Sequence, residues 1–220
     1  MLLSELVSVW RSRLVREVRR KAIHLSGLSV PLGLIFLGRT VTAWAIALAL
    51  AASLILEAQR LRSGISLPVM REHEKTRVAS YIYYMAGCLL AVLIFPKMIA
   101  VTAILFLALG DTVSGLAGSI IKNCDVRSSP APAAGSGCGL GWRVKPMPVI
   151  AATFAACLLI GILTASFTGL AWPVYLCGAA AAAFADGVAV LVQGRSLDDN
   201  FSIPVLSGAL MSGAAWMLAA

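Results

Sequence analysis

The chain has 220 residues and a formal net charge of +8; 60% of its residues are hydrophobic and only 13% are charged. Its mean hydropathy is +0.90. So few polar residues cannot cover the surface of a soluble core, and without a soluble basic region nucleic-acid binding is excluded as well. We therefore expect a protein embedded in membrane lipids.

The first 22 residues predict a basic amphipathic helix that lies on the membrane surface. Apolar residues recur at helical spacing from Leu3 to Val18, and arginines from Arg11 to Arg20 lie largely between them. This basic region is too long for a secretory signal peptide, and no small-residue cleavage site follows it. We expect an interfacial helix over 1–22, followed by one transmembrane catalytic domain over 23–220.

Seven apolar segments predict an all-α fold, a polytopic membrane bundle of about seven transmembrane helices. A helix needs ~20 residues to cross ~30 Å of hydrocarbon; several segments reach this length, whereas the first two are shorter. The connection over 122–146 is rich in Pro, Gly, Ser and Ala, which predicts a flexible loop. The segments cover 23–38, 40–56, 78–95, 98–121, 147–170, 171–193 and 201–220.

The basic residues predict how the bundle is oriented. Of the 18 lysines and arginines, all except Arg39 and Lys97 lie in the four regions that would share one side of the membrane. The positive-inside rule places that side in the cytoplasm, together with the N-terminus and the 122–146 loop. We expect an integral protein of the cytoplasmic membrane, or of an ER-type membrane, with a cytoplasmic active site.

Three ionisable residues stand inside or at the edge of apolar segments. Asp111 lies in LALGDTVSGLAG, Asp186 lies in AAAFADGVAV, and His24 begins the first segment. A charge in a membrane segment is costly and usually functional, although Asp186 could simply pair with a basic side chain. At ~1.5 Å per residue, Asp111 is expected roughly 15 Å and Asp186 roughly 10 Å from the cytoplasmic end of its segment.

Asp198, Asp199 and Asn200 stand immediately before the last apolar segment. One such residue is enough to cap a helix, so two acids together with an amide favour a ligand role. Carboxylate and amide oxygens suit Mg²⁺, which proteins commonly hold through one or two carboxylates plus substrate phosphates. Acids and cations at one membrane face therefore predict phosphoryl chemistry on a lipid, with a soluble nucleotide arriving from the cytosol.

Gly110, Ser114 and Gly118 recur at intervals of four residues around Asp111. This spacing is first of all typical of a helix-packing face, because small residues allow helices to approach closely. As an alternative to packing, Gly118 is a candidate contact for phosphate.

Several stretches resemble the polyprenol kinase family, which includes dolichol kinase, phytol and farnesol kinases and the CTP-dependent diacylglycerol kinase. EVRRKAIHLSG (Glu17–Gly27) resembles its opening E-x-R-R-K-x-x-H, and REHEKTRVASYIYYMAG resembles its charged connection into a tyrosine-containing span. LALGDTVSGLAG resembles G-D-x-x-A-x-x-x-G, with Ser114 in place of the alanine. DDNFSIPVLSG resembles the ending D-D-N-L-T-I-P-L-x-S-G, and Asp186 stands where the family usually has glutamate. The resemblance covers nearly the whole chain in order.

The resemblance implies transfer of the γ-phosphoryl group of CTP to the hydroxyl of a membrane lipid alcohol of the polyprenol, dolichol, phytol or geranylgeraniol type. Mg²⁺ would be the cofactor, with Asp111, Asp198 and Asp199 as its ligands. Either His24 or Asp186 would orient or deprotonate the alcohol, and the sequence does not rank the two. The expected contacts to the nucleotide and its phosphates are Lys145, Arg143, Lys122, Asn200 and Gly118.

The chain departs from this family after the Gly-rich loop. The family usually reads K-S-x-E-G, whereas VKPMPVIA keeps Lys145 and places Pro146, Pro148 and Val149 at the Ser, Glu and Gly positions. Lys122 also replaces the second glycine after the Asp111 segment. Three alternatives follow: a remodelled nucleotide loop, a changed nucleotide preference, or lost activity.

Two other functions are compatible with buried acids in a membrane protein. A CTP-using phospholipid cytidylyltransferase would release pyrophosphate in place of CDP. A small non-enzymatic membrane transporter would be expected to carry acids facing both sides of the membrane, whereas here they gather toward one.

Overall fold

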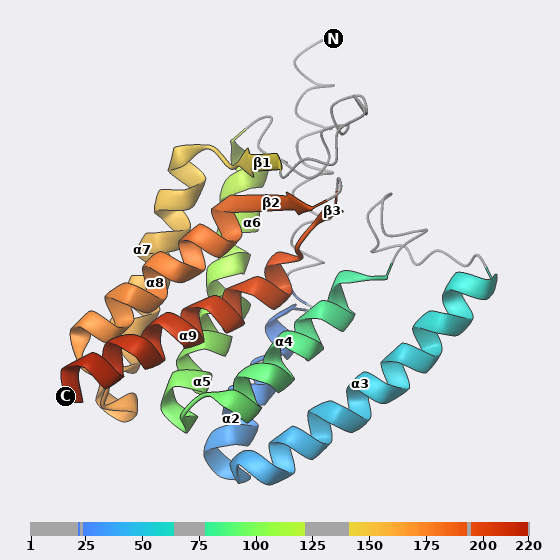
Figure 1. Cartoon of the computed structure of the whole chain (residues 1–220), viewed down its shortest axis with the longest axis horizontal. Coiled ribbons are helices and arrows are strands. Elements are labelled where there is room, and N and C mark those ends of the chain that lie inside the picture. The colour runs from blue at the N-terminus through green and yellow to red at the C-terminus, as the bar shows by residue number, and fades with distance from the viewer. Residues whose placement is uncertain (1–21, 23, 64–77, 122–140, 193–194, 220) are drawn as a thin grey trace.

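The computed structural model describes residue 22 and residues 24–63, 78–121, 141–192 and 195–219, and these are mostly helical (Figure 1). Apart from Ala22, the interfacial helix expected over 1–22 lies outside the described residues. The same is true of residues 64–77 and of most of the 122–146 connection.

Helices form within each of the expected apolar segments. Four helical stretches are long and apolar enough to cross a membrane, judged by length and composition: Gly38–Ser63, Lys97–Ile120, Met147–Thr168 and Asp199–Ala219. The stretches His24–Phe36 and Ser80–Ile94 are apolar but shorter. The elements are α2 (Ser29–Phe36), α3 (Gly38–Ser63), α4 (Ser80–Ile94), α5 (Lys97–Leu105), the π-helical turn η2 (Phe106–Gly110), α6 (Asp111–Ile120), α7 (Met147–Thr168), α8 (Trp172–Gly187) and α9 (Asp199–Ala219).

Helix α9 packs against α8, α4 and α5, and α8 also packs against α7. Small residues allow this close approach. A Cβ atom added at Gly178 of α8 would lie 2.6 Å from the Met211 side chain of α9, and one added at Gly208 would lie 2.2 Å from the Phe95 ring. Phe106, at the start of η2, is fully buried beside Gly178. Helix packing through small residues is common in membrane bundles, because it brings the backbones close together.

The two basic residues expected on the non-cytoplasmic side both contact the carbonyl ends of helices. Arg39 donates a hydrogen bond to the carbonyl of Phe95, which follows α4. Lys97 Nζ donates to the carbonyl of Ile35 in the last turn of α2, at 3.3 Å. Carbonyls at a helix C-terminus lack intrahelical donors and carry partial negative charge, so cations stabilise them.

A buried ion pair joins the far end of α3 to the start of α4. Arg60 donates to both oxygens of Glu57 at 2.8 and 2.7 Å, and the Ala79 backbone N–H and the Tyr81 hydroxyl donate to the same carboxylate, each at 2.8 Å. Glu57 therefore accepts four hydrogen bonds, which compensate the loss of its hydration. This contact fixes α3, most of whose side chains are exposed, against α4.

A small antiparallel sheet in the order β1-β2-β3 was not expected from the sequence. It consists of β1 (Gly141–Val144), β2 (Val188–Val192) and β3 (Arg195–Ser196). The apolar segment predicted over 171–193 is thus divided, because α8 ends at Gly187 and VAVLV continues as a strand. Valine-rich sequence favours strands, and β2 finds its partner in β1, with Val188 opposite Val144.

Candidate functional site

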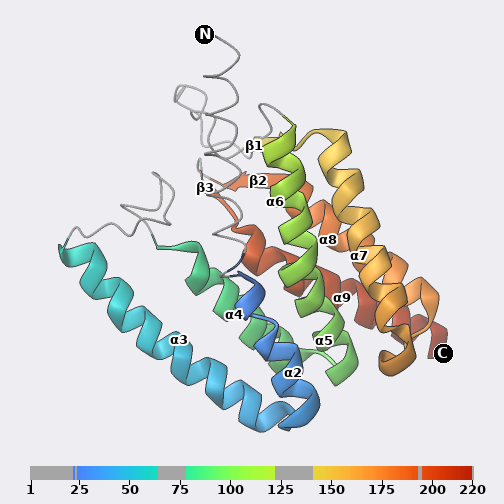
Figure 2. The ribbon, with the colours of Figure 1, turned by 180° about the vertical axis from the view of Figure 1, so that it is seen from behind.

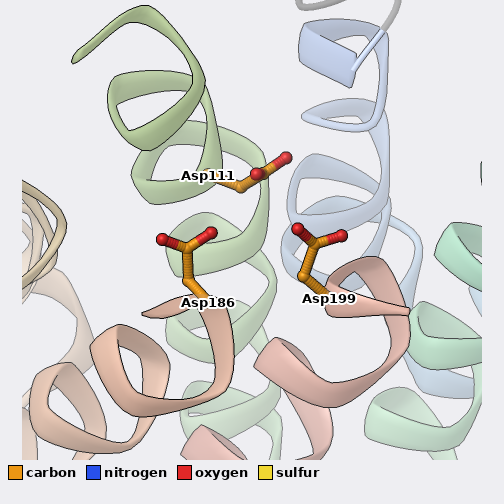
Figure 3. Close-up of side chains that lie close together, drawn as sticks. All are labelled: Asp111, Asp186 and Asp199. Carbon is orange, nitrogen blue, oxygen red and sulfur yellow. The ribbon is translucent and has the colours of Figure 1, made fainter. Parts of the chain in front are cut away.

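Three buried carboxylates lie close together where α6, α8 and α9 meet (Figure 3). Asp111 begins α6, Asp186 lies in the last turn of α8, and Asp199 begins α9. One oxygen from each carboxylate lies within 4.8 Å of the other two. Because α8 ends at Gly187, Asp186 stands at the end of its helix and not roughly 10 Å inside it, as the predicted segment implied.

The position of Asp111 depends on the π-helical turn before it. In η2 the backbone N–H of Asp111 donates to the carbonyl of Phe106, five residues earlier. Such turns insert one residue into an α-helix and often occur at functional sites. Gly110 permits α7 to approach here, since a Cβ atom at this position would lie 2.5 Å from Cys157 Sγ. The Asp111 side chain lies on the side of His24, whose Nδ1 is 3.6 Å from Asp111 Oδ2.

Asp186 is surrounded by hydrogen-bond donors. Lys145 Nζ donates to its Oδ1 at 2.6 Å, while the hydroxyls of Ser114 and Thr153 donate to its Oδ2 at 2.5 and 3.2 Å. Lys145 Nζ also lies 3.2 Å from Ser114 Oγ. The network joins α6, α7 and α8, and the lysine neutralises a carboxylate that would otherwise be unfavourable in a buried position.

The small sheet positions Lys145. This residue directly follows β1, and its backbone N–H donates to the carbonyl of Gly187 at 2.8 Å. Pairing of β1 with β2 therefore brings Lys145 next to the end of α8, where Asp186 lies. The lysine expected to meet phosphate is in the site, but it is paired with a carboxylate.

Asp198 and Asp199 have different surroundings. Asp198 Oδ1 accepts from the backbone N–H of Asn200 at 3.0 Å and from its side-chain amide at 2.7 Å, and Oδ2 accepts from Ser80 Oγ at 3.2 Å. The first of these contacts is the one an N-cap residue makes. Asp199 Oδ1 also accepts from the Asn200 N–H, at 3.1 Å, and the Asp199 carboxylate lies beside those of Asp111 and Asp186. The expected metal ligands were Asp111, Asp198 and Asp199. In the structure the three neighbouring carboxylates are those of Asp111, Asp186 and Asp199, so Asp186 is present in place of Asp198.

Asn200 offers a buried oxygen acceptor next to these residues. The residue is only 1% exposed, and within the described part of the chain its Oδ1 has no hydrogen-bond partner. Its main-chain carbonyl lies four residues before Pro204, which has no N–H to donate. A buried amide oxygen without a donor is unfavourable, and such exceptions in native proteins often mark a ligand position.

The other residues expected in the site lie at different places in the structure. His24 stacks edge-on against Tyr84, with ring centroids 5.1 Å apart. Gly118 lies on α6, two turns beyond Asp111, and a Cβ atom there would meet nothing within 4 Å. Arg143 belongs to β1, and Lys122 lies outside the described residues.

Ser114 and Thr153 are the site residues that the sequence reasoning missed. The spacing of Gly110, Ser114 and Gly118 predicts a packing face for Ser114, although its place three residues after Asp111 puts the two on neighbouring positions of one helix. Thr153 gave no signal beyond being a hydroxyl residue in an apolar segment, where such side chains commonly donate to their own helix. It does so here, to the carbonyl of Val149 at 3.0 Å, in addition to contacting Asp186.

Comparison of the chain with protein-family models, with curated proteins and with solved structures gave no match. The resemblance to the polyprenol kinase family therefore depends on the sequence motifs alone.

Proposed function

We propose that the protein is a CTP-dependent lipid kinase, which transfers a phosphoryl group to the hydroxyl of a membrane lipid alcohol. The observation that carries this proposal is the group of three buried carboxylates, Asp111, Asp186 and Asp199, whose oxygens approach within 4.8 Å in a bundle of apolar helices. The choice of CTP and of an isoprenoid-type alcohol is supported by the sequence resemblance.

The donor set fits a divalent cation of the Mg²⁺ type. Asp111 and Asp199 would hold it, because Mg²⁺ is usually bound through one or two carboxylates together with substrate phosphates. Asp186 already accepts hydrogen bonds from Lys145, Ser114 and Thr153, so we assign it to positioning. When bound, the cation would neutralise charge on the triphosphate oxygens. The buried Oδ1 of Asn200 supplies a further hard oxygen beside the site.

The reaction balances as an in-line substitution. The lipid hydroxyl oxygen forms a bond to the γ-phosphorus of CTP, the bond from that phosphorus to the bridging oxygen breaks, and CDP leaves with both electrons of that bond. The hydroxyl proton passes to a base. His24 suits this role better than Asp186, because its Nδ1 lies 3.6 Å from Asp111, whose carboxylate would stabilise the protonated ring.

We also propose that the chain crosses the membrane seven times, with the N-terminus and the site in the cytoplasm of a cytoplasmic or ER-type membrane. The distribution of lysines and arginines supports this orientation. CTP would then arrive from the cytosol and the alcohol from the bilayer, so the two substrates would meet at the cytoplasmic ends of α8 and α9.

A label-transfer assay tests the proposal. The purified chain in nanodiscs would be incubated with Mg²⁺, an isoprenoid alcohol and CTP labelled at either the γ- or the α-phosphorus. We expect γ-label in the lipid product and CDP in solution. Transfer of α-label to a phospholipid would identify a cytidylyltransferase, and no transfer to any alcohol from any nucleotide would contradict the proposed function.

A further inference from the structure

An apolar groove of about 190 Å³ runs along the flank of the bundle. Figure 2 shows α2 lying alongside α5, and the groove lies between them. One wall is formed by Leu28, which immediately precedes α2, and by Leu32 and Ile35 of α2, at intervals of four and three residues. On α5 the groove is lined by Val101 and Leu105, one turn apart. All residues that line it are apolar.

Both walls of the groove lead to the candidate site. His24 precedes Leu28 by four residues, across a turn in which the backbone N–H groups of Gly27 and Leu28 donate to the carbonyls of His24 and Leu25. On the other wall, Asp111 follows Leu105 after the π-helical turn. These two residues meet, since His24 Nδ1 lies 3.6 Å from Asp111 Oδ2. The residues that line the groove are thus all apolar, and the chain of each wall continues beyond the groove to one member of this polar pair.

The path from the outer end of the groove to the His24–Asp111 pair corresponds to about one leaflet of a bilayer. Between Ile35 and His24 the helix rises ~16 Å, and between Val101 and Asp111 it rises ~15 Å, at 1.5 Å per residue. The hydrocarbon core is ~30 Å thick, so each wall spans about half of it. Phe167, in the last turn of α7, lines the groove as well.

We propose, resting on the proposed function, that this groove holds the hydrocarbon chain of the lipid alcohol with its hydroxyl directed to His24 and Asp111. The occupant must combine an apolar chain with a small uncharged polar end. A hydroxyl can donate to a carboxylate or to an imidazole nitrogen. A phospholipid would bring its phosphate to the place that the proposed function gives to the triphosphate of CTP, and two phosphates repel each other strongly in a region of low dielectric.

Leu32 offers a place to obstruct the groove without disturbing the core. It is 53% exposed, so a larger side chain can be accommodated by the helix while it fills the groove. Leu48 on α3 is the matched control, because it is 67% exposed and does not line the groove. Leu32→Trp and Leu48→Trp therefore add the same side chain to two exposed positions, of which only one faces the groove.

The test is photolabelling in nanodiscs with an isoprenoid alcohol that carries a diazirine near the middle of its chain. Labelled peptides would be mapped by mass spectrometry, with unlabelled alcohol, phospholipid or the hydrocarbon of the same length as competitors. We expect labelling on α2 and α5 that the alcohol suppresses and the hydrocarbon does not. Leu32→Trp should reduce it several-fold, whereas Leu48→Trp should leave it unchanged.

The outcomes separate this proposal from the proposed function. Labelling confined to the groove in a protein that transfers no phosphate would support the groove and contradict the kinase. Phosphate transfer with labelling spread over all lipid-facing helices would support the kinase and overturn the groove. Equal competition by the hydrocarbon or by phospholipid would also overturn it, because the groove would then be filled by any membrane chain.

Discussion

Two adjacent aspartates at the start of α9 have separate tasks. Asp198 accepts the backbone N–H of Asn200 and so caps the helix, while Asp199 joins Asp111 and Asp186. Neighbouring side chains at a helix start point in different directions, because successive residues are rotated by about 100° around the axis. The two residues therefore differ in role: Asp198 caps the start of the helix, and Asp199 contributes a carboxylate to the candidate site.

This division predicts different effects for two matched substitutions. Asp199→Asn should lower phosphoryl transfer on the order of 10²-fold, since it removes a charge from the site, while the thermal unfolding temperature changes little. Asp198→Asn should retain most activity, because asparagine caps a helix about as well as aspartate. Initial rates and unfolding curves of both variants in the same detergent provide the check; equal losses would contradict the assignment.

Lys145 and Asp186 form a buried pair whose energetic coupling can be measured. Removing one partner leaves the other charge uncompensated, which typically costs about 3–5 kcal/mol. Lys145→Met and Asp186→Asn should each destabilise the fold, and the double variant should be clearly more stable than the sum of the two losses implies. Chemical or thermal unfolding of the wild-type protein, the two single variants and the double variant gives the double-mutant cycle and thus the coupling free energy.

Lys97→Met is the control for loss of one positive charge, because Lys97 contacts only a helix-end carbonyl in the described structure. Its effect should remain at about 0.3–1 kcal/mol. Additive losses in the Lys145 cycle would show that the pair contributes no net coupling.

At the scale of single residues, the sequence singled out several residues that lie together in the candidate site. Asp111 and Asp186 were identifiable because a charge in an apolar segment needs a reason. The choice between Asp198 and Asp199 was not accessible, because it depends on the residue at which α9 begins. The pairing of Lys145 with Asp186 depends on contacts between segments 41 residues apart in the chain, which no local pattern reports.

At the scale of elements, close approach of α7 to η2 depends on Gly110. Gly110→Ala should destabilise the protein by about 1–3 kcal/mol, because overpacking forces the surrounding groups to shift and the new Cβ atom would meet Cys157 Sγ. Adding Cys157→Ala should recover part of that loss. Unfolding measurements on the single and double variants test this compensation.

Gly118→Ala is the matched substitution on the same helix, with nothing within 4 Å of the new atom. It should be neutral or stabilising by up to ~1 kcal/mol, since alanine favours a helix over glycine. Unchanged activity is also expected if Gly118 does not contact phosphate, and a strong loss of activity with intact stability would return it to the phosphate site.

The small sheet shows why the strands were not predicted from the sequence, whereas the long helices were. The stretch Val188–Val192 is apolar throughout, so its periodicity does not distinguish a strand from a further turn of α8. The outcome depends on β1, which lies more than 40 residues earlier in the chain and supplies the hydrogen-bonding partner. The long apolar helices α3, α7 and α9 had no such competitor, and their existence followed from composition and length.

At the scale of the whole molecule, the basic residues predict the orientation in the membrane. In a variant without native cysteines, Ser128→Cys should resist an impermeant thiol reagent applied outside intact cells, and Ala220→Cys should react. Permeabilised cells provide the control for Ser128→Cys, which should then be labelled. Labelling of Ser128→Cys in intact cells would reverse the topology and remove the argument for a cytosolic nucleotide.

The bundle as a whole brings together four residues that are far apart in the sequence: His24, Asp111, Asp186 and Asp199. Sequence order alone could suggest that they meet, since they were all expected toward the cytoplasmic side. Their convergence within a few ångströms follows from the packing of α9 against α8 and of η2 against α7 and α9. Whether these converging carboxylates bind a cation decides whether the proposed site exists.

Binding of Mn²⁺, used as a paramagnetic substitute for Mg²⁺, measures this directly by electron paramagnetic resonance on the full chain in nanodiscs. We predict saturable binding that Mg²⁺ displaces, that Asp111→Asn and Asp199→Asn each weaken strongly, and that Asp198→Asn largely preserves. No saturable binding with or without CTP, or binding that survives both Asp111→Asn and Asp199→Asn unchanged, would contradict the assignment of these carboxylates to a metal site.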